Sequence, residues 1–479
     1  MVFAASKVKF CRWNLLLMKY LSTRGGVAPL GFAEAVRMGL ATDGGLLVPE
    51  SVPSVDAQTL AAWRRLRYQD LALEVMAPFV GDALSRAELA DLIDRSYASF
   101  SAPEVTPLVE AGGRSILELF HGPTAAFKDV ALQLLGNLFE HLLARDGGRL
   151  TILGATSGDT GSAAIAGVRG KERIEVFILH PQGRISPIQE RQMTTVLDAN
   201  VHNIALRGNF DDAQRLVKAL FCDLHFKQRY RLGAVNSINW ARILAQMVYY
   251  FYAWGRSAEA LPDGRVSFAV PTGNFGDIFA GYLAKRMGLP IDRLMLATNR
   301  NDILTRFVHS GAYAAGEVHA TCTPAMDIQL ASNFERYLYY LVGEDPGRVR
   351  RLLDALTADG RLSVTAAEHA QVQADFDAVA VDDEATLQQM GQTFATSGYI
   401  LDPHTAVGVR AAGEGSAVIC LATAHPAKFQ EAVREAIGRE APPPPGLQGL
   451  MDKPTRCALL DAEAQALRDY IAEALHDRF

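Results

Sequence analysis

The sequence predicts an α/β protein with open, mostly parallel β-sheets, because short apolar runs alternate along it with segments of helical period. The alternation begins near Ser115. The expected buried strands are residues 150–155, 175–179, 201–206, 266–270, 294–297 and 417–422. Most of them are followed by about ten or more residues of helical period, as parallel strand connections require. We therefore expect more than one such sheet.

The chain has 479 residues, enough to bury more than one hydrophobic core. We expect a mainly helical N-terminal region over residues 18–100, an α/β domain over 101–260 and a second α/β domain over 261–441. In residues 442–479, four consecutive prolines predict a stiff linker, and residues 459–475 have the period of a helix that docks on the surface.

Residues 1–17 contain Lys7, Lys9 and Arg12, and no acidic residue precedes Glu34. That composition could indicate a transit peptide. We favour a disordered extension instead, because the segment from Met18 to Gly26 resembles a natural beginning followed by a helical pattern.

Composition excludes several classes of protein. The net charge is -6, without a basic stripe, so we expect no nucleic acid partner. Five widely separated cysteines without a CxxC pair favour reduced thiols, a cytoplasmic location and neither a zinc site nor a disulfide framework. We expect no bound metal. No apolar run approaches the length of a membrane span.

Lys128 is the centre of the most informative segment, residues 121–129. Pro123 and Thr124 predict a turn followed by an N-cap, which would place Lys128 in or near the first turn of a helix. The helix dipole and partial burial beside Phe127 would both lower the pKa of that lysine. A neutral amine suits imine formation, and pyridoxal phosphate is the most frequent carbonyl partner. Alternatively, Lys128 is an ordinary surface lysine.

Three loops follow predicted strands, where open α/β sheets bind ligands. Residues 154–161 and 271–277 are rich in glycine and small polar residues, and each precedes a helix, so their N–H groups could bind an anion. Either loop could also be an ordinary turn, with Asp277 as a helix cap. After the last strand, Thr423 could offer its hydroxyl to a ring nitrogen or cap the strand.

From Met18 onward the chain resembles the threonine synthase family of bacteria and fungi. The resemblance rests on several motifs that occur in order: MKYLSTRG at 18–25, FHGPTAAFKD at 120–129, ATSGDTG at 155–161, PTGNFGD at 271–277, MDI at 326–328, SNFER at 332–336, LDPHTAVG at 401–408 and ATAHPAKF at 422–429. It implies a fold-type II pyridoxal phosphate enzyme, similar to the tryptophan synthase β subunit.

The resemblance also implies roles for individual residues. Lys128 matches the lysine that forms the Schiff base with pyridoxal 5'-phosphate, and Thr423 matches the threonine that meets the pyridine nitrogen. The cofactor's phosphate would be held by Gly273, Asn274, Phe275, Gly276 and Asp277. The substrate's carboxylate would be held by Thr156, Ser157, Gly158, Asp159 and Thr160. Asp159 departs from the asparagine that many fold-type II relatives have near the cofactor's phenolic oxygen, so its role is open.

The family reaction needs a second anion site for the phosphate of the substrate. Arginine side chains fit phosphate oxygens bidentately. The candidates are Arg184, Ser186, Asn236, Ser237 and Arg242. Both arginines could instead form ion pairs on helix surfaces. We expect His121 and His404 to be structural.

The implied activity is that of a lyase that converts O-phospho-L-homoserine and water to L-threonine and phosphate, with Lys128 moving the protons. One alternative is a phospholyase that converts the same substrate to a 2-keto acid. Another is a non-catalytic homologue that binds a small anion. We expect a monomer or weak dimer without a membrane partner.

Overall fold

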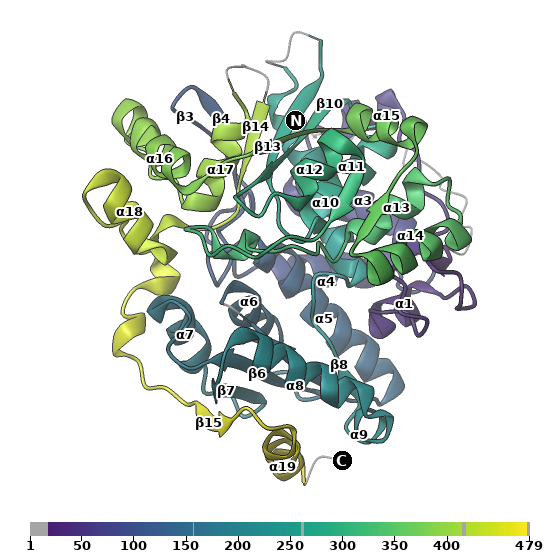
Figure 1. Cartoon of the computed structure of the whole chain (residues 1–479), viewed down its shortest axis with the longest axis vertical. Coiled ribbons are helices and arrows are strands. Elements are labelled where there is room, and N and C mark those ends of the chain that lie inside the picture. The colour runs from purple at the N-terminus through teal and green to yellow at the C-terminus, as the bar shows by residue number, and fades with distance from the viewer. Residues whose placement is uncertain (1–17, 157, 260–262, 414–417, 477–479) are drawn as a thin grey trace, which may run out of the picture.

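The computed structural model describes residues 18–156, 158–259, 263–413 and 418–476 (Figure 1). The expectation of a disordered extension at residues 1–17 lies outside the described residues. Within the described chain, two large sheets confirm the predicted α/β architecture. The six-stranded sheet has the order β13-β10-β9-β14-β4-β3, and the five-stranded sheet has the order β15-β7-β6-β5-β8.

The six-stranded sheet is parallel except for its edge pair, β3 and β4. Its strands are β3 (Leu108–Ala111), β4 (Arg114–Glu118), β9 (Val266–Pro271), β10 (Ile291–Thr298), β13 (Phe376–Ala380) and β14 (Val418–Ala422). Its helices are α10 (Trp240–Ser257), α11 (Gly276–Arg286), α12 (Ile303–Ser310), α13 (Phe334–Leu341), α14 (Pro346–Asp359), α15 (Ala366–Asp375), α16 (Asp383–Ser397), α17 (Pro403–Ala411) and α18 (Gln430–Ile437). A small antiparallel pair joins β11 (Ala312–Ala314) to β12 (Arg361–Ser363).

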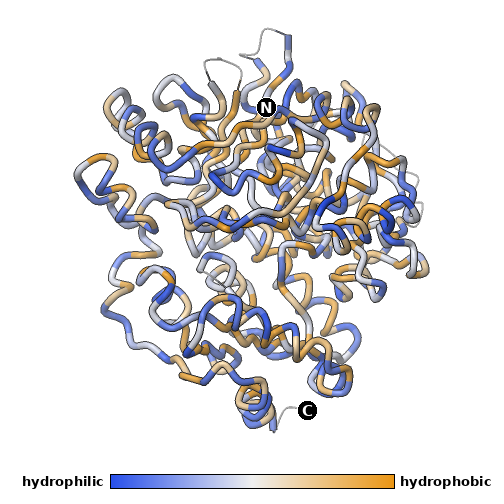
Figure 2. The backbone as a smooth tube through the Cα atoms, in the orientation of Figure 1, coloured by the Kyte–Doolittle hydropathy of each residue, from blue (hydrophilic) through white to orange (hydrophobic). Residues whose placement is uncertain are grey.

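The five-stranded sheet is parallel throughout. Its strands are β5 (Leu150–Ala155), β6 (Ile174–Pro181), β7 (Val201–Arg207), β8 (Leu232–Gly233) and β15 (Ala458–Asp461). Its helices are α5 (Lys128–Asp146), α6 (Asp159–Val168), α7 (Pro187–Thr194), α8 (Phe210–Cys222), α9 (Leu224–Arg229) and α19 (Ala464–Ala474). In Figure 2, polar and apolar residues alternate along outer helices such as α8 and α19, as expected of helices with one buried face.

The N-terminal region is mainly helical, as predicted. Its helices are α1 (Phe32–Met38), α2 (Ala57–Trp63), α3 (Tyr68–Val80) and α4 (Arg86–Tyr97), and β1 (Tyr20–Ser22) pairs with β2 (Leu47–Pro49). Helix α10 connects this region to both sheets, because it packs against α3, α5 and α11. Almost every α10 side chain is buried, so this helix runs through the interior of the molecule.

The sheets cross the ranges expected from the sequence. Strands β3 and β4, from range 101–260, belong to the six-stranded sheet, and β15, from range 442–479, belongs to the five-stranded sheet. The helix predicted over residues 459–475 is wrong at its start, since residues 458–461 form β15 and pair with β7. Pairing with a partner strand outweighs local helical period there. Beyond it, Leu467 and Ile471 of α19 are fully buried in the core of the five-stranded sheet.

No helix in the described part of the chain combines the length and the apolar character that crossing a membrane requires.

Candidate active site

Three loops meet at one edge of the six-stranded sheet. Strands β9, β14 and β4 are neighbours and run parallel. Their carboxyl ends therefore lie side by side, and ligands in open α/β sheets bind at such ends. The loop after β4 leads to Lys128, the loop after β9 is residues 272–275, and the loop after β14 begins at Thr423. The sheet order thus brings together segments that are distant in sequence.

The backbone before Lys128 runs beside the loop that follows β14. The Phe127 N–H donates to the Thr423 carbonyl at 2.8 Å, and the His425 N–H donates to the Ala125 carbonyl at 3.1 Å. Ala126 and Ala424 form an antiparallel bridge. Thr423 is buried, and its hydroxyl makes no hydrogen bond among the described residues. That hydroxyl is therefore available to a ligand beside Lys128.

Lys128 is the first residue of α5, as predicted, but Thr124 is not the N-cap of that helix. Phe127 occupies the cap position. Thr124 instead donates its N–H to Asp129 Oδ2 at 2.8 Å and its hydroxyl to Oδ1 at 2.7 Å. Asp129 can accept both bonds because its carboxylate reaches back across the turn. The turn is thus closed by a residue inside the helix.

The Lys128 side chain is only 12% exposed, so the alternative of an ordinary surface lysine is wrong. Its Nζ lies 3.4 Å from Asp159 Oδ2 and 4.9 Å from the centre of the Phe127 ring. Burial lowers the pKa of Lys128, Asp159 opposes that change, and the charges of Lys428 and Arg242 lower the pKa further. The amine consequently loses its proton more easily than an ordinary lysine.

The loop after β5 places Asp159 opposite Lys128. The Thr156 hydroxyl accepts hydrogen bonds from the N–H groups of Gly158 at 3.0 Å and Gly161 at 2.9 Å, which fixes the loop. Gly158 has a φ of 146°, and a Cβ there would meet the Gln189 side chain at 2.4 Å. Thr160 is half-buried in the first turn of α6. Ser157, predicted to bind the substrate's carboxylate, lies outside the described residues.

Lys428, which sequence reasoning did not single out, contacts the same carboxylate. Its Nζ lies 2.6 Å from Asp159 Oδ1, and Gln189 donates to that oxygen at 2.8 Å. Burial alone would raise the pKa of Asp159, but Lys428 and then Lys128 outweigh it and hold that pKa well below its ordinary value. Lys428 lies in the quoted motif at 422–429, which was the available signal. Asp159 is thus an anion between two lysines.

The loop after β9 offers backbone donors to an anion. Within the described chain, none of the N–H groups from Gly273 to Ile278 donates a hydrogen bond to a protein acceptor. These groups lead into the first turn of α11, where the helix dipole favours negative charge. A Cβ on Gly273 would lie 2.8 Å from the Ala325 carbonyl oxygen, so the loop has no room for a side chain there. Asn274 Oδ1 accepts a hydrogen bond from Ser332 at 3.1 Å.

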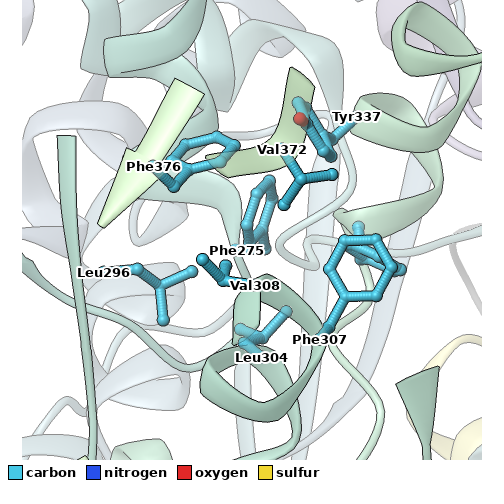
Figure 3. A pocket seen from close by; sticks show the side chains of 9 residues that line it. Phe275, Leu296, Leu304, Phe307, Val308, Tyr337, Val372 and Phe376 are labelled. Atoms are coloured by element: carbon cyan, nitrogen blue, oxygen red, sulfur yellow. The ribbon is translucent and has the colours of Figure 1, made fainter. Parts of the chain in front are cut away.

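Phe275 anchors this loop rather than offering its ring to a ligand. The residue has a φ of 63°, in the left-handed region, and is 2% exposed. Figure 3 shows its ring in an apolar pocket with side chains such as Leu296, Phe307 and Phe376. The pocket closes tightly around these side chains and leaves no room for a water molecule. Burial of this ring therefore offsets the cost of the left-handed backbone at Phe275.

The Asp277 side chain is held by two tyrosines of α10. Phe275, not Asp277, is the N-cap of α11. The hydroxyls of Tyr249 and Tyr250 donate to Asp277 Oδ1 at 2.5 and 2.9 Å, whereas Oδ2 has no partner among the described residues. Burial raises the pKa of Asp277 to about 6, although both tyrosine hydrogen bonds and Lys128 oppose the change. Only the backbone N–H of Asp277 belongs to the set of N–H groups, from Gly273 to Ile278, that are available to an anion.

The two candidate arginines differ sharply. Arg242 is 4% exposed, forms no ion pair with a described carboxylate, and leaves Nε and Nη1 without partners. Burial lowers the pKa of Arg242 to about 10. The alternative of a surface ion pair is therefore wrong for this residue. Arg184 is exposed, and its charge acts on Asp212 at the start of α8.

The other candidates for the substrate's phosphate, Ser186, Asn236 and Ser237, also differ in where they lie. Ser186 caps α7, since its hydroxyl accepts from the Gln189 N–H at 3.3 Å. Ser237 lies near the loop after β9, because its hydroxyl is 2.7 Å from that of Ser332, which bonds Asn274. Asn236 is half-buried, and its carbonyl accepts from the Asn239 N–H at 3.5 Å. Ser237 therefore lies beside the loop after β9, whereas Ser186 is the N-cap of α7.

These residues fit pyridoxal phosphate. A buried lysine with a lowered pKa can react with an aldehyde. A row of free N–H groups at a helix start can hold a phosphate, and the free Thr423 hydroxyl can meet a ring nitrogen without charging it. Arg242 adds unpartnered donors for a second anion. Within the described chain, no group of His, Cys, Asp and Glu residues is arranged to hold a metal ion.

Family comparisons cover most of the chain. Residues 102–423 match the family described as pyridoxal-phosphate dependent enzyme. Residues 19–97 match a threonine synthase N-terminal model, and residues 405–471 match a threonine synthase C-terminal model.

Individual relatives agree with these matches. A threonine synthase of Pseudomonas aeruginosa is 48% identical over 463 residues, which cover 95% of this chain and 98% of that protein. The crystal structure of pyridoxal-phosphate-bound threonine synthase from Brucella melitensis superposes with a TM-score of 0.93 at 46% identity, covering 96% of this chain and 100% of that one. Yeast threonine synthase gives a TM-score of 0.92 at 44% identity, with 97% and 99% covered.

Proposed function

Because this chain belongs to the threonine synthase family of pyridoxal-phosphate-dependent enzymes, we propose that it converts O-phospho-L-homoserine and water to L-threonine and phosphate, with Lys128 as its catalytic residue. The reaction is a β,γ-elimination and replacement, the last step of threonine biosynthesis. The single observation that carries the proposed role of Lys128 is its buried amine, 3.4 Å from Asp159 and beside the loops that can hold the cofactor.

When bound, pyridoxal 5'-phosphate supplies a ring that spreads the negative charge left when a proton leaves the substrate. The chain's own residues do the rest. Lys128 Nζ is the base that removes the proton from the substrate's α carbon, because burial keeps its amine ready to accept one. The same nitrogen is the candidate to move the later protons, at the β and γ carbons.

The cofactor would be held by its phosphate and its ring. The N–H groups from Gly273 to Asp277 would bind the phosphate without a charged side chain. The Thr423 hydroxyl would meet the pyridine nitrogen, and a neutral hydroxyl leaves that nitrogen largely unprotonated.

The substrate would be held by its carboxylate and its phosphate. We assign the carboxylate to residues 156–160 at the start of α6, where the Thr156 hydroxyl accepts hydrogen bonds from the N–H groups of Gly158 and Gly161. We assign the phosphate to Arg242, with Ser237 and Asn236 nearby in sequence, because Arg242 has buried donors that find no partner in the described part of the chain. Phosphate binding would offset the cost of burying that guanidinium. Arg184 is exposed, which makes it the weaker candidate.

The proposal is tested by incubating the purified enzyme, loaded with pyridoxal phosphate, with O-phospho-L-homoserine. Phosphate release and product identification are measured together. Equal amounts of phosphate and L-threonine are expected. A 2-keto acid in place of threonine would establish the phospholyase alternative, and no turnover would favour the non-catalytic homologue.

We also propose that the enzyme acts as a monomer or weak dimer in the cytoplasm. One chain supplies Lys128, Asp159, Arg242 and the loop after β9, so the site is assembled without a second copy. The cytoplasmic location rests on the wide spacing of the cysteines in the sequence. Light scattering across a range of protein concentrations tests the oligomeric state.

A further inference from the structure

A second lysine is buried beside Lys128. Lys428 ends the short 3-10 helix η2 (Pro426–Lys428), which follows β14, and its side chain is fully buried. Its Nζ lies 2.6 Å from Asp159 Oδ1 and donates to the Thr124 carbonyl at 2.8 Å. Lys428 thus joins the loop that follows β14 to the Lys128 segment and to the Asp159 loop.

The two lysines contact different oxygens of one carboxylate. Lys428 and Gln189 share Asp159 Oδ1, whereas Lys128 lies 3.4 Å from Oδ2. Because Lys428 is the nearer of the two, it neutralises most of the Asp159 charge that Lys128 would otherwise feel. Lys128 therefore faces a nearly neutral pair rather than a free anion.

The other charged groups around Lys128 do not restore a counter-ion. Arg242, from α10, is a further positive charge. Asp277, from α11, accepts hydrogen bonds from Tyr249 and Tyr250, and Lys128 is the smallest of the influences that lower its pKa. On α5 itself, Asp129 accepts two hydrogen bonds from Thr124. Asp159 is therefore the carboxylate closest to the Lys128 amine in the described chain, and Lys428 has the stronger contact with it.

We propose that Lys428 is a positioning residue that holds Asp159 as an anion and so leaves Lys128 without a full counter-ion, ready to act as a neutral amine. This inference rests on the proposed role of Lys128. The Asp159–Lys428 pair is electrically similar to a neutral amide, but its anion stays in place whether or not Lys128 carries a proton.

Charge substitutions on both partners test the proposal. The variants are Lys428→Met, Asp159→Asn and the double variant, each prepared as apoenzyme and mixed with pyridoxal phosphate. The growth rate of the visible absorption band is measured against pH, because only the neutral amine of Lys128 captures the aldehyde. Borohydride reduction and peptide mapping identify the lysine that is attached. Lys171→Met is the matched control, since Lys171 contacts Glu140 and Asn137 instead.

Lys428→Met is expected to raise the pH midpoint of capture by about 1 unit or more, which slows capture at pH 7 about tenfold, because Asp159 then pairs with Lys128 alone. Asp159→Asn is expected to lower the midpoint, since Lys128 then faces the charge of Lys428. The double variant should return close to the parent protein. Lys171→Met should leave the midpoint unchanged.

Several outcomes would overturn the proposal. One is a Lys428→Met protein that captures the cofactor with the parent's midpoint, and another is a shift of both single variants in the same direction. If Lys428→Met does not fold, Asp159→Asn and the double variant still decide, because removing Lys428 must raise the midpoint in the asparagine background too. Attachment to another lysine in the parent protein would instead refute the proposed function.

Discussion

Lys128 Nζ and Asp159 Oδ2 lie 3.4 Å apart, and both side chains are almost excluded from solvent. Lys128 follows β4 of the six-stranded sheet and begins α5, which packs against α6, whereas Asp159 follows β5 of the five-stranded sheet and begins α6. The site therefore lies where the loops that follow β4 and β5 meet. Any change in how the sheets pack would alter the distance between amine and carboxylate.

Replacing the amine gives the most direct prediction. Lys128→Ala is expected to abolish the visible absorption of the loaded enzyme and to lower turnover at least about 10³-fold, because the covalent anchor and the base are lost together. The circular dichroism spectrum should stay the same. Lys171→Ala, a lysine paired with Glu140, should retain both the band and the activity. A Lys128→Ala protein that still turns over would refute the catalytic role.

A side chain at Gly273, in the loop after β9, should weaken cofactor binding. Gly273→Ala would place a Cβ 2.8 Å from the Ala325 carbonyl oxygen and 3.0 Å from Ile328, so the loop must shift. We expect the Kd for pyridoxal phosphate to rise about tenfold or more, equivalent to about 1.4 kcal/mol. Equilibrium titration of the apoenzyme measures it. Gly31→Ala is the control, because its Cβ would meet only Glu34, at 3.7 Å.

The two arginines should respond differently to the loss of charge. Arg242→Gln is expected to lower kcat/KM for O-phospho-L-homoserine by about 10- to 100-fold, because a charge-assisted hydrogen bond contributes about 1.5–3 kcal/mol. Arg184→Gln, at an exposed position, should change it less than about threefold. Unfolding free energy should not fall in Arg242→Gln, since Nε and Nη1 have no partners in the described protein. A reversed order of the two effects would assign the phosphate to Arg184.

The raised pKa of Asp277 predicts that the stability of the fold depends on pH. Burial raises the pKa of Asp277 to about 6, above the ordinary 3.8, so the folded protein holds this proton more tightly than the unfolded chain. The associated stability is present below about pH 4 and is lost as the pH rises to about 6. Asp277→Asn should therefore gain stability over the parent across this range, by at most about 3 kcal/mol at pH 7.

Urea unfolding of the apoenzyme at pH 4 and pH 7 measures this difference. Asp359→Asn is the control, because that carboxylate is exposed at the end of α14. An Asp277→Asn protein whose relative stability is the same at both pH values would contradict the expected titration.

The sequence alone indicated the loops of the site and most of its strands, but not β4. Apolar runs marked β5, β6, β7, β9, β10 and β14, because complete burial of a parallel strand leaves a continuous hydrophobic signal. It also placed Lys128 at the start of a helix, although Thr124, the cap residue on which that prediction relied, bonds Asp129 and does not cap the helix. Short strands such as β15 gave no such signal, because pairing with β7, not local period, fixes them.

Only the tertiary structure decided which side chains meet. Lys428 bonds Thr124 from 304 positions away. Arg242 is buried without a counter-ion among the described residues, although its sequence suits an exposed helix face equally well. Asp277 bonds two tyrosines of α10 instead of capping its own helix. Local patterns report whether a residue is buried, whereas the order and packing of strands decide what it is buried against. The charges around Lys128 therefore depend on the order and packing of the strands.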